Sequence, residues 1–183
     1  MKVFLREFLL TLLSAAIIFL ILQTAFQTFV VIGISMKPTL QEEQRLMVNK
    51  LVYKLHQPER GDVIVFEPPQ DGREDYVKRL IGIPGDKVQI KQGTVYINGE
   101  VLDEDYINEE PHYNMSSVIV KEDEYFVLGD NRNRSNDSHN GWMVPQQNIV
   151  GKVWLSIWPP EKWGLITHHP LEEQLSSPDQ TGD

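Results

Sequence analysis

An apolar run without a single charged residue extends from Phe8 to Val31, and it constrains the whole chain. As a helix, residues 8–31 would reach roughly 36 Å, which is enough to cross a hydrocarbon core of about 30 Å. The run is long for the apolar part of a cleavable signal peptide, and no good cleavage site of small residues follows it. We therefore predict a transmembrane helix over 8–31 that remains as an anchor, with a cleaved signal peptide as the alternative.

The charges on either side of this run predict its orientation. Lys2 and Arg6 precede it, whereas Lys37 and Arg45 follow at a distance and among acidic residues. Because positive charges close to a span favour the cytoplasmic side, residues 1–7 are predicted to be a short cytoplasmic N-terminus. The chain is then a single-pass protein with its main domain outside the cytoplasm, and the lipid bilayer is an expected partner.

Composition excludes several classes of function. The formal net charge of −9 argues against a nucleic-acid partner, because no basic face could easily outweigh it. The chain has no cysteine, so disulfides and thiolate metal sites are excluded. The segment 164–183 holds four acidic residues without any Lys or Arg. Since its hydrophobic pattern also fades, we predict a poorly ordered acidic tail there.

Downstream of the span, the hydrophobic pattern changes to that of β-strands. Short runs rich in β-branched residues are bounded by Gly, Pro and Asn, and Asn98-Gly99 has the sequence of a type I′ hairpin turn. The predicted strands lie near 62–66, 76–81, 95–97, 100–102, 124–128 and 150–158. We expect a mainly-β domain over 32–163, with an acidic, irregular surface excursion at 103–124.

Ser35 is the first candidate for chemistry, although alone it could equally be an ordinary turn residue. A serine nucleophile needs a base and donors for the oxyanion. Lys78 lies on the predicted strand 76–81 beside Arg79, so one of two neighbouring cations must face the interior if either face of the sheet is covered. Apolar burial would lower the lysine pKa from about 10.4 and allow it to act as a base, whereas a lysine at a strand edge would reach solvent.

A histidine base is the alternative. His139 and Asp137 lie in a loop of short polar side chains, and with Ser35 they could form a triad, because triads are recognised by geometry and not by chain order. The same loop composition is also typical of Asx turns without catalytic meaning. A non-enzymatic alternative is a membrane-tethered β domain that binds partners through 103–124.

Four stretches of the sequence together resemble the signature boxes of bacterial type I signal peptidases. They follow an N-terminal span in the family's order and spacing, and they are Ser35–Leu40, Arg60–Phe66, Tyr76–Asp86 and Gly129–Ser138. The resemblance covers about residues 8–160. It implies an antiparallel β-sheet or partial-barrel catalytic domain and a membrane-anchored serine endopeptidase that removes signal peptides from exported preproteins, cleaving after small residues. It implies no metal and no cofactor, and we expect a monomer in a plasma (inner) membrane or a thylakoid-type membrane.

The resemblance also implies roles for individual residues. Ser35 matches the nucleophile, and its backbone N–H matches an oxyanion donor. Lys78 matches the general base. Ser135 matches a serine that hydrogen-bonds this lysine, while Asp137 and Arg132 match positions that stabilise the loop. The substrate pockets would be lined by apolar side chains near the boxes, and for these we predict Phe29, Val31, Leu40 and Val77.

Two residues depart from the family pattern. Gly33 stands where some members carry a serine that supplies a second oxyanion donor, so such a donor must come from elsewhere or be absent. His139 stands where many members carry arginine, so its contact with Asp137 is expected to be weaker and pH-dependent.

A self-cleaving repressor is a further alternative, because it also uses a Ser/Lys pair. Such a protein would need a DNA-binding module where this chain has an apolar span.

Overall fold

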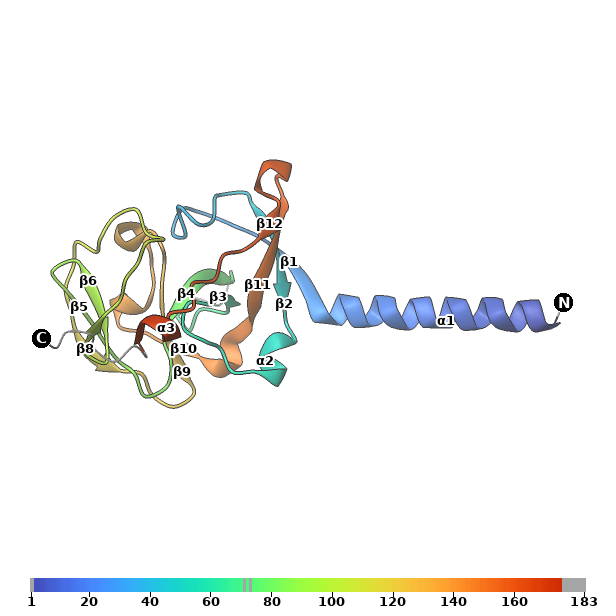
Figure 1. The fold of residues 1–183 in the computed structure, drawn as a ribbon, viewed down its shortest axis with the longest axis horizontal. Coiled ribbons are helices and arrows are strands. Elements are labelled where there is room, and N and C mark those ends of the chain that lie inside the picture. Colours follow the sequence, from blue (N-terminus) through green and yellow to red (C-terminus); the bar gives the residue numbers. More distant parts are fainter. Residues whose placement is uncertain (1, 71, 73, 176–183) are drawn as a thin grey trace, which may run out of the picture.

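The computed structural model describes residues 2–70, 72 and 74–175, in which one long helix projects from a β domain (Figure 1). This helix, α1 (Lys2–Ala25), carries exposed apolar side chains on all sides. Its segment Val3–Ala25, with a mean hydropathy of 2.3, is the one helix among the described residues that is long and apolar enough to cross a membrane. A helix that is apolar all round needs a surrounding apolar phase.

The helix ends six residues earlier than predicted. Strand β1 (Phe26–Val30) follows it directly and pairs antiparallel with β2 (Arg45–Asn49). The predicted span over 8–31 is therefore wrong at its C-terminal end. Residues 26–30 are rich in Phe, Thr and Val, which favour strands, and β2 offers them a backbone partner that a longer helix would forgo.

Most strands belong to one antiparallel sheet in the order β1-β2-β11-β3-β4-β9-β10, with β12 beside β11. Its further strands are β3 (Val63–Phe66), β4 (Tyr76–Gly82), β9 (Glu124–Leu128), β10 (Val144–Pro145), β11 (Ile149–Trp158) and β12 (Gly164–Leu165). The short helix α2 (Val52–Leu55) follows β2. All four residues of β3 are buried, so this strand is the centre of the sheet, and its register places Ile64 opposite Lys78 and Val63 opposite Arg79.

A second, smaller sheet has the order β7-β6-β5-β8. It consists of β5 (Lys87–Lys91), β6 (Thr94–Ile97), β7 (Glu100–Val101) and β8 (Met115–Ile119). The hairpin at Asn98-Gly99 is confirmed, with positive φ at both residues. The irregular excursion predicted over 103–124 is wrong in part, because it contains β8 and the buried Tyr106. Two serines within β8 obscure its apolar alternation in the sequence.

The mainly-β, antiparallel architecture is confirmed, but the predicted tail is partly wrong. Within 164–175, β12 pairs with β11, Leu171 is fully buried in the core of the second sheet, and Glu172 in α3 (Glu172–Leu175) forms an ion pair with Arg60. A few buried apolar residues such as Leu171 suffice to hold a polar segment on the domain, and the average composition of the segment does not reveal them. Residues 176–183 of the predicted tail lie outside the described residues.

Four short 3-10 turns complete the fold: η1 (Arg132–Arg134), η2 (Ser138–Asn140), η3 (Gln146–Asn148) and η4 (Pro160–Lys162). The first two form the loop that follows β9. That loop packs beside the turn that leads out of β1, since Asn131 N–H donates to the carbonyl of Ser35. Two segments about a hundred residues apart thereby meet at the end of the sheet, and this is where the polar groups gather.

Candidate active site

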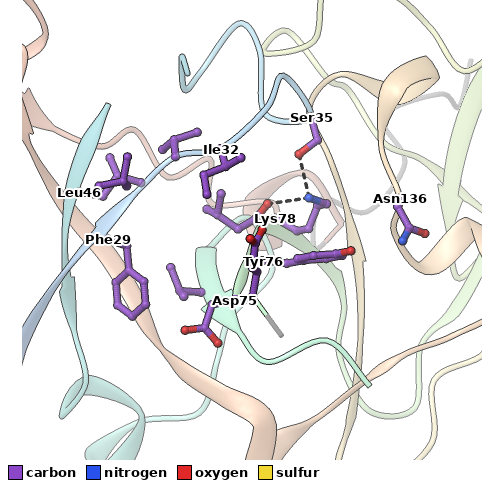
Figure 2. Close-up of a pocket in the computed structure, with 13 residues that line it drawn as sticks. Phe29, Ile32, Ser35, Leu46, Asp75, Tyr76, Lys78 and Asn136 are labelled. Carbon is purple, nitrogen blue, oxygen red and sulfur yellow. Dashed lines mark hydrogen bonds between the residues drawn. The ribbon is translucent and has the colours of Figure 1, made fainter. Parts of the chain in front are cut away.

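Ser35 and Lys78 meet directly near the start of β4 (Figure 2). Lys78 Nζ lies 2.8 Å from Ser35 Oγ and donates a hydrogen bond to the carbonyl of Val77 at 2.9 Å. Ser35 sits in the turn after β1, and Lys78 sits on the part of β4 that pairs with β3. The two side chains therefore come from separate elements and have the geometry of a nucleophile and its base.

The surroundings of Lys78 favour its neutral form. The residue is only 4% exposed, and among the described residues no carboxylate lies within ion-pair distance of its Nζ. Burial lowers its pKa to about 8, although the charges of Asp137 and Asp130 act in the opposite direction. A lysine with this pKa has an appreciable neutral fraction near neutral pH and can accept a proton.

The polar loop after β9 holds the backbone of the serine. Asn131 donates twice, through its backbone N–H to the Ser35 carbonyl at 2.9 Å and through its side-chain amide to the Ile34 carbonyl at 3.1 Å. Gly129 lets the loop come close, because a Cβ there would lie 2.5 Å from the Ser35 carbonyl oxygen. Asn131 is a positioning residue that the sequence did not reveal, since nothing distinguished it from neighbouring asparagines.

Arg79, next to Lys78, points to the other face of β4 and is fully buried. Its guanidinium donates to both carboxylate oxygens of Asp130, at 2.9 and 2.7 Å, and to the Gly61 carbonyl at 2.9 Å. Asp130 also accepts a hydrogen bond from the hydroxyl of Thr39. This ion pair links β4, the loop after β9 and the segment beyond Ser35. The alternation of side chains along this strand predicted one buried cation, whereas Lys78 and Arg79 are both buried.

Asp137, for which the resemblance implies a role in stabilising the loop, lies in the loop after β9. It is fully buried and accepts hydrogen bonds from the backbone N–H groups of Gly129 at 2.9 Å and His139 at 3.2 Å. The His139 ring makes the expected contact, with its Nδ1 2.6 Å from Asp137 Oδ1, and stacks on Tyr113. His139 does not line the cavity beside Ser35, so the alternative triad is not assembled in this structure.

The other two residues with implied loop roles differ in their contacts. Ser135 Oγ is buried without a hydrogen-bond partner among the described residues, so the expected bond to Lys78 is not formed. It packs against Gly129, where a Cβ would lie only 2.2 Å away. Arg132 donates to the carboxylate of Glu104 and to the Gly129 carbonyl, so it ties the loop to the segment before β8.

A cavity of about 200 Å³ opens beside Ser35, between β1 and the start of β4 (Figure 2). Phe29, Val31 and Val77 line it as predicted. Leu40 does not, because its side chain is fully buried in the core beside Met36. Sequence reasoning missed the other lining residues, which are Val30, Ile32, Leu46, Val65, Glu74, Asp75, Tyr76 and Asn136. The lining residues at the end of β1 were missed because the membrane helix was predicted to continue to residue 31.

The backbone N–H of Ser35 is available as a donor to an oxyanion. Among the described residues, no acceptor lies within hydrogen-bond distance of the Ser35 N–H, and Gly33 adopts a positive φ of 82° without contributing a side chain. No cluster of three or more His, Asp or Glu side chains that could hold a metal occurs in the described part of the chain. The arrangement suits acyl transfer by a serine with a lysine base.

Comparison with known proteins agrees with this chemistry. The family model described as "Signal peptidase, peptidase S26" matches residues 5–158. The probable signal peptidase I-2 of Synechocystis sp. is 43% identical over 146 residues, which cover 77% of this chain and 67% of the relative. Signal peptidase IB of Staphylococcus aureus is 36% identical over 176 residues, which cover 84% of this chain and 91% of the relative.

A solved structure is also similar. The crystal structure of a signal peptidase I from Enterococcus faecalis V583 is 38% identical, and the match covers 53% of this chain and 97% of that chain with a TM-score of 0.47. The family model spans most of the apolar helix, the turn that carries Ser35 and the strand that carries Lys78. The chain belongs to the signal peptidase family, peptidase S26.

Proposed function

We propose that the protein removes signal peptides from exported preproteins, as a membrane-anchored serine endopeptidase in which Ser35 is the nucleophile and Lys78 the general base. Membership of the signal peptidase family supports the reaction. The observation that carries the residue assignment is the 2.8 Å contact between Ser35 Oγ and the Nζ of the buried Lys78.

In the acylation step, neutral Lys78 accepts the hydroxyl proton as Ser35 Oγ attacks the scissile carbonyl. The Ser35 N–H donates to the developing oxyanion. Collapse of the tetrahedral intermediate breaks the peptide bond, and the Lys78 ammonium returns its proton to the leaving amine, so the mature protein departs. A water then gives a proton to Lys78 and attacks the acyl-enzyme. Collapse of this second intermediate breaks the bond between Ser35 Oγ and the acyl carbon, Oγ takes the proton back from Lys78, and the signal peptide departs with a free carboxylate.

The substrate is proposed to bind as an extended strand between β1 and β4. β1 is an edge of the main sheet, and Tyr76–Lys78 pair only with β3, so both rims of the cavity present free backbone groups. Four antiparallel pairings separate β1 from β4, so the two strands run in the same direction. A signal peptide that leaves the membrane beside α1 would run parallel to β1 toward Ser35. Residues before the cut would then occupy the cavity, whose volume suits small side chains.

The loop residues are assigned supporting roles. Asp137 fixes the backbone of Gly129, Arg132 holds the loop through Glu104, and Asn131 holds the carbonyl of Ser35. Ser135 is proposed to orient Lys78 when the substrate closes the site, because its buried hydroxyl has no partner among the described residues. These groups position the dyad and do not themselves react.

We further propose that residues 1–7 are cytoplasmic, and that the β domain lies outside the cytoplasm against the bilayer. Support comes from Lys2 and Arg6 in the first turns of α1, and from three exposed apolar residues at the end of β11 and in or next to β12, namely Trp158, Trp163 and Leu165. β11 and β12 lie on the side of the domain from which α1 projects (Figure 1). Indole side chains favour the membrane interface. The protein is proposed to act as a monomer, because all the groups of the site come from one chain. A plasma membrane or a thylakoid-type membrane would suit it equally.

The test is cleavage of a preprotein by the full-length protein in neutral detergent. Ser35→Ala should abolish product formation, and Lys78→Ala should reduce the rate by about 10²–10⁴-fold, because a general base contributes that much. Ser117→Ala and Lys87→Ala, on exposed positions of β8 and β5, are matched controls that should keep the wild-type rate. Substantial activity of Lys78→Ala would refute the lysine base, and a wild type that binds but never cleaves would favour a non-catalytic binding domain.

A further inference from the structure

A second cavity opens where α1 joins the domain, and the catalytic mechanism makes no use of it. Its volume is about 510 Å³. Thr24, in the last turn of α1, forms part of its wall, and the rest comes from the β2–α2 region and from residues around the start of β11. These further lining residues include Lys50, Tyr53, Lys54, Gln146 and Gln147. The cavity therefore lies at the depth where the span leaves the hydrocarbon.

Lys50 is held at this depth by direct bonds to the end of the helix. Its backbone N–H donates to the carbonyl of Ala25, the last residue of α1, at 2.8 Å. Its Nζ lies 3.3 Å from the side-chain oxygen of Gln27 on β1. The position of this cation relative to the end of the helix is thus fixed by the fold, whichever way the helix crosses the membrane.

Lys54 adds a second cation one helical turn further on. The Asn49 side chain accepts hydrogen bonds from the N–H groups of Leu51 and Val52, which starts α2 and brings Lys54 to the same cavity as Lys50. Among the described residues, the lining contains these two lysines and no Asp or Glu. Neither lysine has a carboxylate within ion-pair distance in the described part of the chain.

The remaining lining offers donors and an apolar wall. The hydroxyl of Tyr53 is engaged by Asp62 at 2.7 Å, so its ring faces the cavity as apolar surface, and the amides of Gln146 and Gln147 supply neutral polar groups. Leu55, the next residue after Lys54, is 80% exposed. This surface presents two cations, amide groups and an exposed leucine at the membrane boundary. It therefore suits a ligand with a phosphate group, a polar headgroup and acyl chains below them.

We propose that this cavity binds the headgroup of an anionic phospholipid. The chain carries a net charge of −9, so an anionic membrane surface would repel the domain unless cations face the lipid where the two meet. The lysine pair provides this local attraction and sets how the domain sits beside the span. The inference rests on the membrane anchoring by α1 and not on the Ser35–Lys78 dyad.

The experiment measures bound lipid by native mass spectrometry of the full-length protein in neutral detergent, with phosphatidylglycerol and phosphatidylcholine offered together. The wild type should retain phosphatidylglycerol preferentially. Lys50→Gln with Lys54→Gln should lower that preference by roughly 30-fold, the effect of two cations at an anionic surface. Lys87→Gln with Lys91→Gln makes the same charge change on exposed positions of β5 and should leave the preference unchanged.

Inorganic phosphate distinguishes a lipid from a free anion. It should not displace phosphatidylglycerol at equal concentration, because it lacks the acyl chains; displacement would mean a free phosphate site and would overturn the lipid assignment. Equal loss of preference in the two double variants would also overturn it, since the effect would then be one of net charge. Because the readout is bound lipid, a failure of the proposed catalysis would leave this result intact.

Discussion

Lys78 and Arg79 are neighbours on one strand, and the structure buries both, with 4% and 0% of their surfaces exposed. Arg79 makes a bidentate ion pair with Asp130, donates to the Gly61 carbonyl and stacks over Tyr106 at 4.2 Å. Among the described residues, Lys78 has only a hydroxyl and a backbone carbonyl as hydrogen-bond partners. Both cations are desolvated, but the charge of only one is compensated by a bonded carboxylate.

The difference explains how Arg79 can be structural while its neighbour Lys78 is proposed as the base. A buried charge must be paired or must lose its proton. Asp130 compensates the buried charge of Arg79 and so links the elements, whereas burial lowers the pKa of Lys78, which has no bonded carboxylate among the described residues, to about 8. Alternation along β4 places the two on opposite faces, so the same strand can carry a rigid ion pair and a titrating base.

The largest expected effect on activity comes from removing Lys78, the proposed base. Lys78→Met keeps the apolar stem and deletes the base, so the cleavage rate should fall by about 10³-fold, while the free energy of unfolding stays equal or rises. Preprotein cleavage and denaturant unfolding of the full chain measure the two quantities. A Lys78→Met protein that lost stability and activity together would indicate a structural role for this lysine.

Removing Arg79, the structural cation, should instead lower the stability of the fold. Arg79→Met leaves Asp130 buried without its partner and should lower the free energy of unfolding by about 3–5 kcal/mol. The double variant Arg79→Met with Asp130→Leu should recover much of this loss, which a double-mutant cycle by denaturant unfolding would measure. If the single and double variants were equally unstable, the ion pair would not be the source of the effect.

Titration of Lys78 should cause an intermediate effect. Cleavage should fall roughly tenfold for each pH unit below about 8, because the protonated lysine cannot accept the serine proton. Initial rates between pH 5 and 9 measure this limb. A rate that stayed flat down to pH 5 would exclude a lysine base.

The same titration should appear in stability. Folding lowers the Lys78 pKa from 10.5 to about 8, so the native state bears the full cost of the buried charge below pH 8. This cost is relieved as pH rises from about 8 to 10.5. The stability of the wild type relative to Lys78→Met should therefore increase by about 3 kcal/mol over that window. Unfolding midpoints of the two proteins at matched pH would show it, and a constant difference would contradict it.

The smallest effect should come from His139, which acts on Lys78 only through Asp137. The Asp137 charge raises the Lys78 pKa, so a permanent cation in contact with this carboxylate should lower the pKa. His139→Arg should place the acid limb of the rate at lower pH than the uncharged His139→Gln does, so that their rates near pH 7 differ by roughly threefold. Tyr113, stacked on the ring, stays unchanged in both variants. Equal acid limbs in the two variants would assign His139 a packing role alone.

Much of the site was predictable because its key residues stand in ordered boxes. Ser35, Lys78 and Asp137 lie where the family resemblance places them, and Phe29, Val31 and Val77 line the cavity. Leu40 was misplaced, because a residue close in sequence to the nucleophile can still turn into the core. Asn131 and Asp130 were missed, since the loop offers many similar side chains and only packing decides which of them reach Ser35 and Arg79.

The sequence by itself determined the apolar span, the β class of the domain and the two residues that are proposed as nucleophile and base. These depend on local periodicity, charge and motif order, which are properties of neighbouring residues. Only the tertiary structure decided that the helix ends at Ala25, that residues 164–175 dock on the domain, and that Lys78 lacks a bonded carboxylate while Arg79 has one. Those outcomes depend on which distant groups arrive beside each residue, and burial and pairing acquire their energies only when the chain has packed.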